Sequence, residues 1–554
     1  MKRISLVFSL SFLCVLIQAQ TTTGKIDSLK DAWSETITYV GEIKAGKPNG
    51  LGMAIYNNDY ALRYVGYFVN GKYEGKGVLL FKNGSFLSGD WKAGKLNGQG
   101  ANFNSDKDLY VGNFVNGEKN GSGTFIYADN SFLQGNFKND QYNGRCIYIG
   151  REGNIISDNI YVGNKKNGPG YQYEVSDKKL YEGIWKDGEW QQSSSGNYNS
   201  FLKNSAFYGE KNSSQILMGI IDKNNDDYLS DTGFYYDLEK SKRYFGYHKN
   251  GFLESGLTIR DDSSRFIGKI NDDGAYGYCS FMKMGKYYDE GDFVKDYLNG
   301  NNCLSINIDK KSVYYGQTTG QAQFTGKAWF ASASSDLYNG EYVDGSFTGT
   351  GWRIDKAGYC VKGTWNKGNV VTITSLYNNR GEVVTIKPAT LSEALSAVIT
   401  ASKDEFLGIQ GNDDYSEEYD WLYTTFEGLI HFPGTSGKDL VASDIDDYWY
   451  YIAPFAQTES FEEAKVKYNQ LCSQVKSASI TLKKGSAAVK LTGDIATLDE
   501  EKSFSISQFE LPPAIKGYDN FAVSVLLKKN EDGEYTVLIV CGDDFGPLQW
   551  EDED

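Results

Sequence analysis

Polar and apolar residues alternate in a short unit that recurs along the first two thirds of the chain. Residues 110–127, YVGNFVNGEKNGSGTFIY, show the unit clearly. Tyr110, Gly112 and Phe114 occupy alternate positions, so they point to one face of a strand. The Asn-Gly pair at 116–117 supplies the positive φ angles of a tight hairpin turn. The pattern therefore predicts a strand that ends in a two-residue turn.

A return strand is expected after this turn. Gly121 and Gly123 permit a sharp re-entry into the strand 124–127. We expect Gly112 to leave room for an aromatic ring from the next unit, since a glycine in a strand often marks a close approach. Each unit is thus a predicted β-hairpin, and stacked hairpins bury an aromatic stripe that one hairpin alone cannot bury.

The unit repeats with a nearly regular period. Gaps between its central glycines are mostly 22 to 28 residues, which indicates about fourteen copies. The central glycines are Gly41, Gly66, Gly89, Gly112, Gly135, Gly163, Gly183, Gly219, Gly246, Gly268, Gly291, Gly316, Gly340 and Gly363. With 62 Gly, 8 Pro, 41 Tyr and 30 Phe, the composition is typical of a β-rich chain with many turns.

The side chains that define the repeat are predicted to be structural. They are Tyr39, Gly41, Tyr64, Gly66, Phe68, Gly89, Trp91, Tyr110, Gly112, Phe114, Gly135, Phe137, Tyr161, Gly163, Tyr181, Gly183, Trp185, Gly363 and Trp365. Some copies depart from the pattern, because Asp289 replaces the first aromatic residue, while Lys165 and Thr318 replace the second.

Tyr-x-Gly-x-Phe/Trp followed by a turn glycine and Asn-Gly-x-Gly resembles the MORN repeat, and the resemblance covers roughly residues 37–370. It implies a MORN-repeat protein of the exported bacterial type, with roles in protein interaction or membrane-associated assembly. The fold class it implies is mainly β: an extended array of stacked β-hairpins in a single-layer sheet over residues 37–385. At two strands per unit the array would be roughly 130 Å long. An insertion at 186–216 leaves open that the rod bends or splits near residue 200.

A different pattern begins after residue 385. Capping boxes at Thr390–Glu393 and Ser460–Glu463 precede helical apolar patterns. Five strand-like runs follow at 479–484, 487–493, 503–509, 521–529 and 535–542. Residues 386–550 therefore form a predicted α+β domain with an antiparallel sheet. The last four residues, 551–554, form an acidic tail.

The N-terminus has the features of a secretory signal. Lys2 and Arg3 precede an apolar stretch at 4–17, and Ala19 completes a small-residue cleavage site, so 1–19 is a predicted signal peptide. Residues 20–36 then form a linker or short helix. The mature chain is expected to be exported to the periplasm, the cell surface or the medium.

Charge separates the array from the C-terminal domain. Residues 386–554 contain 31 acidic residues, 13 Lys and no Arg, whereas the first 385 residues are nearly neutral. An acidic domain repels nucleic acid and anionic membranes, so no nucleic-acid partner is expected.

Candidate chemistry is sparse. The glycine-rich turns lack the Lys-Ser/Thr pair and the following helix of a phosphate loop. Asp222, Asn224 and Asp226 have calcium-loop spacing, but Asp227 and Gly233 occupy the positions of the required glycine and acidic residue. His431 is a candidate general base in the C-terminal domain, with no second histidine there.

The cysteines offer neither a disulfide nor a metal site. Cys279 and Cys303 occupy equivalent positions of adjacent repeats, about 10 Å apart, which is too far for a disulfide. We therefore predict no catalytic, cofactor-binding or metal-binding residues.

Three functions follow in order of preference. The first is a non-catalytic exported scaffold that binds a protein partner, which includes a second copy of the chain. The second is association of the repeats with a membrane lipid surface. The third is a hydrolase in the C-terminal domain or near residue 200, for which no nucleophile, base or metal set is visible.

Overall fold

The structure, a computed structural model, describes residues 21–543 except 175, 177–178, 192–204, 212–214, 223–224, 238, 240–241, 250–251, 261–263, 272, 321–322, 404, 414–423, 444–447, 484 and 519. The predicted signal peptide and acidic tail lie outside these residues. Most of the described chain is β-strand, so the mainly β prediction is confirmed.

The first sheet, sheet A, contains fifteen antiparallel strands in sequence order. Strand β1 lies within residues 20–36, so the expected linker or short helix there is wrong: part of this segment adds a strand to the edge of the sheet. After β1, seven hairpins run from β2–β3 to β14–β15. The strands are β1 Thr22–Lys30, β2 Thr36–Lys44, β3 Lys47–Tyr56, β4 Ala61–Val69, β5 Lys72–Phe81, β6 Phe86–Lys92, β7 Lys95–Phe103, β8 Leu109–Val115, β9 Glu118–Ile126, β10 Phe132–Lys138, β11 Gln141–Ile149, β12 Ile155–Val162, β13 Lys165–Glu174, β14 Lys179–Lys186 and β15 Glu189–Gln191.

The second sheet, sheet B, contains seventeen strands, and its hairpins run from β17–β18 to β30–β31. The strands are β16 Ser205–Lys211, β17 Gln215–Asp222, β18 Asn225–Asp237, β19 Lys242–Lys249, β20 Phe252–Ile259, β21 Ser264–Asn271, β22 Gly274–Lys283, β23 Tyr287–Val294, β24 Tyr297–Leu298, β25 Gly300–Asn307, β26 Ser312–Thr319, β27 Gln323–Ala331, β28 Leu337–Val343, β29 Ser346–Ile354, β30 Cys360–Asn366, β31 Asn369–Tyr377 and β32 Val383–Val384. The sheets therefore change at the predicted insertion.

The hairpin turn forms as the sequence predicts, but the return strand begins earlier. Asn116 and Gly117 have φ of 52° and 90° and join Val115 directly to Glu118. Gly121, with φ of 93°, lies within β9 next to a bulge. The return strand thus starts at residue 118 and not at 124, and the bulge bends the hairpin.

The first aromatic ring of a unit lies over its own hairpin. Gly66 and Gly77 are cross-strand partners, and a Cβ added at Gly77 would lie 2.5 Å from Tyr64 Cζ. The Tyr64 hydroxyl donates to the Tyr67 carbonyl at 3.2 Å. Tyr110 repeats this arrangement over Gly112 and Gly123. The expectation that the ring comes from the next unit is therefore wrong, because the ring reaches back only to its own paired glycines.

The bulge brings the end of each hairpin back onto this ring. Phe68 pairs with Tyr73 beyond the bulge. The Tyr73 ring stacks on Tyr64 at 3.8 Å between centroids, and Phe68 makes an edge contact with Tyr64 at 5.2 Å. The aromatic stripe of sheet A is thus buried by its own hairpins.

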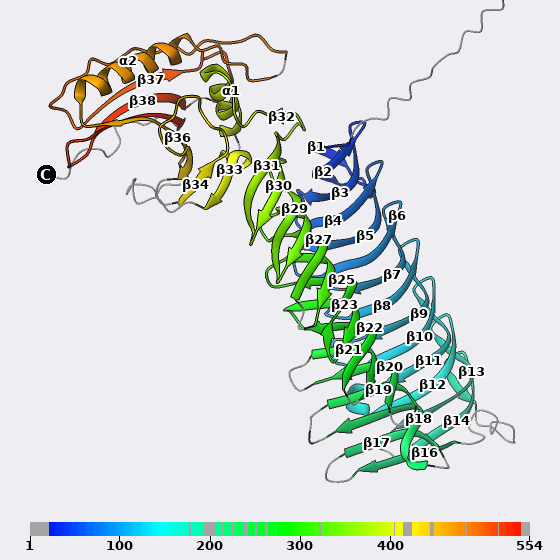
Figure 1. Ribbon diagram of the computed structural model, residues 1–554. Helices are drawn as coiled ribbons and strands as arrows, with labels where there is room; N and C mark the ends of the chain where they lie inside the picture. The colour runs from blue at the N-terminus through cyan, green and yellow to red at the C-terminus, as the bar shows by residue number, and fades with distance from the viewer. Residues whose placement is uncertain are drawn as a thin grey trace, which may run out of the picture.

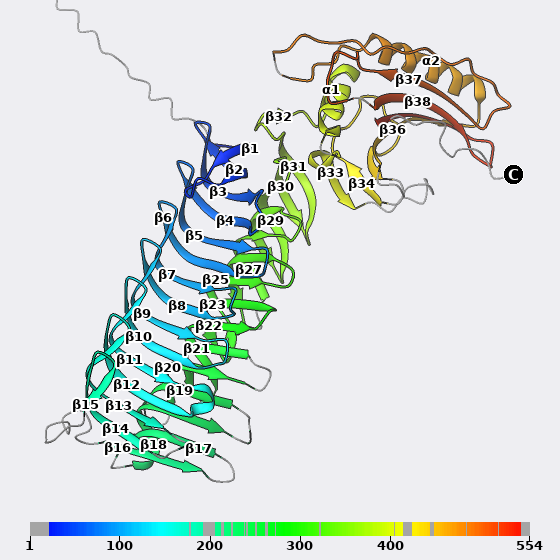
Figure 2. The ribbon, with the colours of Figure 1, turned by 180° about the vertical axis from the view of Figure 1, so that it is seen from behind.

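The two sheets run side by side and face each other (Figures 1 and 2). One core joins aliphatic residues of sheet A, such as Val65 and Val78, to residues of sheet B, such as Ile306 and Val313. The Phe86 and Tyr288 rings meet across the interface at 5.0 Å. We call the faces that meet here the inner faces and the opposite ones the outer faces.

The array is therefore a two-layer sandwich and not one extended single-layer rod of 130 Å. Each sheet is apolar on both faces, because aliphatic residues such as Val65 alternate with the aromatic stripe. A single layer would leave the aliphatic face in water, and pairing the sheets buries it.

Arginine side chains also connect the sheets. Arg63 of sheet A is 1% exposed and donates hydrogen bonds to Ser335 Oγ at 2.9 Å and to the Lys311 carbonyl. Arg265 of sheet B donates to Asn130 Oδ1 of sheet A. Burial lowers the pKa of each guanidinium to about 10.

A third sheet with two helices forms the C-terminal part. Its order is β33-β34-β35-β36-β39-β38-β37, with all pairs antiparallel. The elements are α1 Leu391–Ser402, β33 Gln410–Asp413, β34 Thr424–Gly428, β35 Leu440–Ser443, β36 Trp449–Thr458, α2 Phe461–Ser477, β37 Phe504–Glu510, β38 Phe521–Lys529 and β39 Tyr535–Asp543. This domain attaches to the end of sheet B. There the Val370 N–H donates to Asn412 Oδ1 at 2.8 Å, and Asn412 Nδ2 donates to the Val370 carbonyl at 2.9 Å.

Both predicted helix caps are present, since Thr390 and Ser460 accept hydrogen bonds from the Glu393 and Glu463 N–H groups. The runs 479–484 and 487–493, however, form no strand in their described residues; they take part in two isolated bridges, Ile480 with Val489 and Thr492 with Glu510. Strands β33 to β36 were not predicted. Three of them are four or five residues long, which is too short for a clear alternating pattern.

Neither helix that the structure describes has the length and apolarity needed to cross a membrane.

The packing of Tyr64 against Gly77 predicts that a methyl group added at Gly77 destabilises the protein. Gly77→Ala should lower the free energy of unfolding by about 1–3 kcal/mol, because the new Cβ collides with the ring. Thermal and urea unfolding followed by circular dichroism measures the change. Gly320→Ala is the matched control, since its Cβ meets nothing nearer than 3.9 Å. Equal destabilisation by both variants would contradict this account, and adding Tyr64→Leu to Gly77→Ala should restore part of the loss.

Candidate functional site

The predicted repeat residues lie mainly on the outer faces of the two sheets. Most of their aromatic rings are buried there, and Tyr181 is partly buried. In sheet A they include Tyr39, Tyr64, Phe68, Trp91, Tyr110, Phe114, Phe137, Tyr161 and Trp185, and in sheet B Trp365. The central glycines Gly41, Gly66, Gly89, Gly112, Gly135, Gly183 and Gly363 lie mid-strand beneath this layer.

Gly163 does not occupy a central position. It lies in the turn between β12 and β13, with φ of 56°, and Asn159 pairs with Gly170 at the central place. Tyr161 is accordingly the second aromatic residue of its unit, not the first. The glycine spacing predicts Gly163 as a central residue only because Asn159 stands where the series otherwise has glycine.

Cysteine replaces the second glycine in several units whose first ring is absent or different. Tyr39, Tyr64 and Tyr110 cover a return-strand glycine, whereas Cys146, Cys279 and Cys303 stand opposite Gly135, Gly268 and Gly291. The first positions of those three units are Leu133, Phe266 and Asp289. A thiol therefore fills part of the space that a tyrosine ring takes elsewhere. All six described cysteines are free and buried.

The largest departure from the repeat makes a hollow on the outer face of sheet B. The register aligns Phe281, Asp289, Ser305 and Tyr314 on neighbouring strands. In the unit of Tyr110, the same two middle positions hold Tyr110 and Phe125. Two adjacent rings are thus replaced by small polar side chains.

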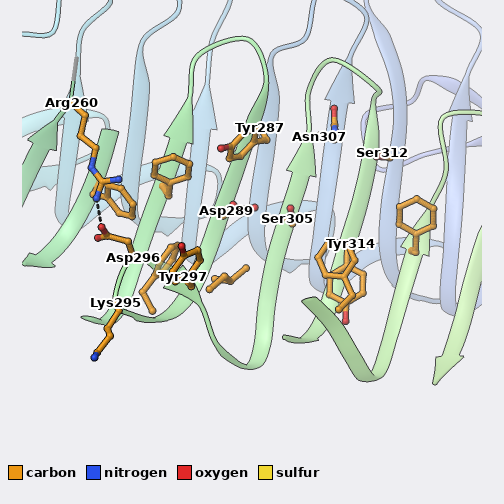
Figure 3. A pocket seen from close by; sticks show the side chains of 16 residues that line it. Arg260, Tyr287, Asp289, Lys295, Asp296, Tyr297, Ser305, Asn307, Ser312 and Tyr314 are labelled. Atoms are coloured by element: carbon orange, nitrogen blue, oxygen red, sulfur yellow. Dashed lines mark hydrogen bonds and ion pairs between the residues drawn. The ribbon is translucent and has the colours of Figure 1, made fainter. Parts of the chain in front are cut away.

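The hollow has a volume of about 560 Å³ and aromatic walls (Figure 3). On one side Phe266 and Phe281 pack at 4.4 Å, and Phe281 and Tyr287 at 5.5 Å. On the other side Tyr314 stacks on Phe324 at 3.7 Å. Asp289 and Ser305 lie between the two walls, so polar groups form the centre of the site between aromatic rings.

Of the two aspartates in the hollow, Asp296 is paired with an arginine, whereas Asp289 has no basic partner among the described residues. Burial raises the pKa of Asp289 to about 6, and a hydrogen bond from Ser305 opposes this effect. Arg260 pairs with Asp296 and covers the Phe266 ring at 4.6 Å. The Lys295 side chain points away from the centre (Figure 3). Among the described residues no basic side chain pairs with Asp289.

The other candidate chemistry lies elsewhere. His431 Nδ1 is 3.5 Å from Asp439 Oδ2, and this buried partner raises the pKa of the imidazole. Asp439 also accepts a hydrogen bond from the Phe432 N–H at 3.3 Å, so the pair fixes a turn. Asn224 of the calcium-like spacing lies outside the described residues. Within the described part of the chain, no cluster of three His, Cys, Asp or Glu residues is arranged to hold a metal.

Comparison with protein families gives a match inside sheet A. The MORN repeat model matches residues 39–59, 64–86, 88–100, 110–132 and 134–155. These five segments are MORN repeats. They begin in hairpins β2–β3 to β10–β11, in which a tyrosine or leucine stands two residues before each central glycine. MORN repeats are commonly involved in protein or membrane binding. Hairpins of the same kind continue beyond the matched MORN segments, through the rest of sheet A and into sheet B.

Removing the charge of Asp289 should stabilise the protein. Its pKa of about 6 exceeds the ordinary value of about 3.9, so the folded state loses stability as the carboxyl ionises on raising the pH from 4 to 6. Asp289→Asn should therefore raise the free energy of unfolding by about 1–2 kcal/mol at pH 8, with the gain vanishing near pH 4. Urea unfolding at a series of pH values measures this gain. Asp292→Asn, an exposed carboxyl on the same strand, is the control, and a pH-independent difference would contradict the assignment.

Proposed function

We propose that the chain is a non-catalytic scaffold whose MORN-type array binds a protein partner through the outer face of sheet B. The observation that carries this proposal is the hollow around Asp289. In sheet A the aromatic row is closed by its own hairpins, whereas here two rings are replaced and a cavity of about 560 Å³ opens. Binding sites are typically concave and apolar with a few convergent polar groups.

Accessible aromatic surface adds to this site. Tyr297, at the edge of the hollow, is 50% exposed. Tyrosine is enriched at protein interfaces because it provides a large apolar ring with a polar end. A partner that inserts a side chain into the hollow would cover this ring as well.

Export is part of the proposal. It rests on the charged and apolar pattern of residues 1–19, and it places the scaffold in the periplasm, on the cell surface or in the medium. Mass spectrometry of the native protein from a non-cytoplasmic fraction should show a chain that begins near Gln20.

Two alternatives remain distinct from the scaffold. Membrane-surface binding is consistent with MORN repeats, although the acidic C-terminal domain disfavours anionic lipid. A hydrolase in the C-terminal domain would need a cavity with converging catalytic groups. The cavity of about 300 Å³ beside α1 is lined by residues that include Ser392, Ser396 and Lys483, and His431 is not among them.

Site-specific crosslinking tests the partner surface. A photoreactive residue in place of Tyr297 should give a covalent adduct with one protein in the native cell. The matched control is Tyr60 on sheet A, which is 51% exposed. An adduct that forms at position 297 but not at 60 supports the proposal, and a second copy of the chain in the adduct identifies self-association. Absence of the adduct, together with flotation of the purified protein on vesicles, would replace the scaffold with membrane binding.

A further inference from the structure

We propose that the hollow around Asp289 binds an organic ammonium group, such as the Nζ group of a lysine side chain. The inference deepens the proposed function and rests on it for the source of the lysine, which is the partner protein. The chemistry of the site itself comes from the side chains of sheet B.

The first argument is the unpaired negative charge. Asp289 is partly buried, and a carboxylate that loses contact with water is costly unless it is paired; among the described residues, Ser305 is its hydrogen-bond donor. Arg260 cannot supply the missing charge, because it is already paired with Asp296. A ligand that carries one positive charge would compensate Asp289.

The second argument is the aromatic walls. Cations are attracted to the faces of aromatic rings, and recognition of ammonium ligands by aromatic cages is the established use of this interaction. Rings lie on both sides of the Asp289–Ser305 pair, because the register places Phe281 beside Asp289 and Tyr314 beside Ser305. Tyr287 lies two residues before Asp289 on the same strand and lines the hollow as well (Figure 3). The Asp289 carboxylate would repel an anionic ligand, and a wholly apolar ligand would leave the negative charge of Asp289 unpaired.

The third argument is the origin of the space. The hollow combines three changes from the Tyr64 unit: Asp289 replaces the tyrosine, Cys303 replaces the glycine, and Ser305 replaces the apolar cross-strand residue. A volume of about 560 Å³ lies in the range of small-ligand sites, about 300–1,000 Å³. The site thus has room for a side chain and not only for an inorganic ion.

Calorimetric titration of the full mature chain tests the proposal. The probe is Nα-acetyl-lysine methylamide, and the neutral control ligand is the same compound acetylated at Nε. Binding of the charged probe with at least about tenfold preference over the neutral one supports the inference. Failure of the charged probe to bind, or equal binding of both compounds or of a neutral sugar, overturns it.

Variants show whether the binding occurs in the hollow. Asp289→Asn should lower the affinity for the charged probe at least about tenfold, while Asp292→Asn should leave this affinity unchanged. The double variant Asp289→Tyr with Cys303→Gly rebuilds the ring-over-glycine arrangement of Tyr64 and Gly77. It should fold with an unchanged circular dichroism spectrum and lose binding, and retained binding would overturn the assignment.

The pH profile provides a second readout. The other charged groups at the hollow are Arg260, Lys295 and Asp296; its further titratable groups are tyrosines 287, 297 and 314, and Cys303 lies beneath. Affinity should fall about tenfold from pH 7 to pH 5 as Asp289 is protonated. A pH-independent affinity would overturn the role of Asp289. Loss of ammonium binding would leave the crosslinking result at Tyr297 intact, so the two proposals fail separately.

Discussion

The contact between a tyrosine ring and two cross-strand glycines determines the geometry of the array. Tyr64 lies across Gly66 and Gly77, and its hydroxyl bonds a carbonyl three residues along the strand. This arrangement leaves no room for a Cβ on either glycine. Because the bulge follows immediately, the hairpin end bends back and adds Phe68 and Tyr73 to the same cluster. The outer face of sheet A is closed by these local contacts, so it is the aliphatic inner face that needs a partner sheet.

The local part of this structure could be predicted from sequence. The Asn116–Gly117 turn, the shared face of Tyr110 and Phe114, and both helix caps each depend on residues close in the chain. The pairing of the two sheets could not be predicted in the same way. It depends on contacts such as Phe86 with Tyr288, which are some two hundred residues apart, and on the apolar character of both faces.

The candidate site could be predicted only in part from the sequence. Asp289 was recognisable as a departure from the repeat, because it stands where an aromatic residue is expected. The hollow, however, requires a second small side chain, Ser305, which the register places beside Asp289 on the neighbouring strand. A single polar substitution in an aromatic row could be covered by the neighbouring rings. Two adjacent ones open a hollow, and only the strand pairing shows that they are adjacent.

The cysteines show that the array adapts differently at each place where a tyrosine is lost. At Leu133 and Phe266 the first side chain is still apolar, and a thiol opposite the central glycine fills the remaining space. At Asp289 the thiol of Cys303 is also present, yet the side chain above it is charged and its neighbour is a serine. Packing alone would favour another apolar residue, since an ionised carboxyl that is partly withdrawn from water lowers stability. The charge of Asp289 therefore costs the fold stability, and the proposed ammonium ligand would compensate it.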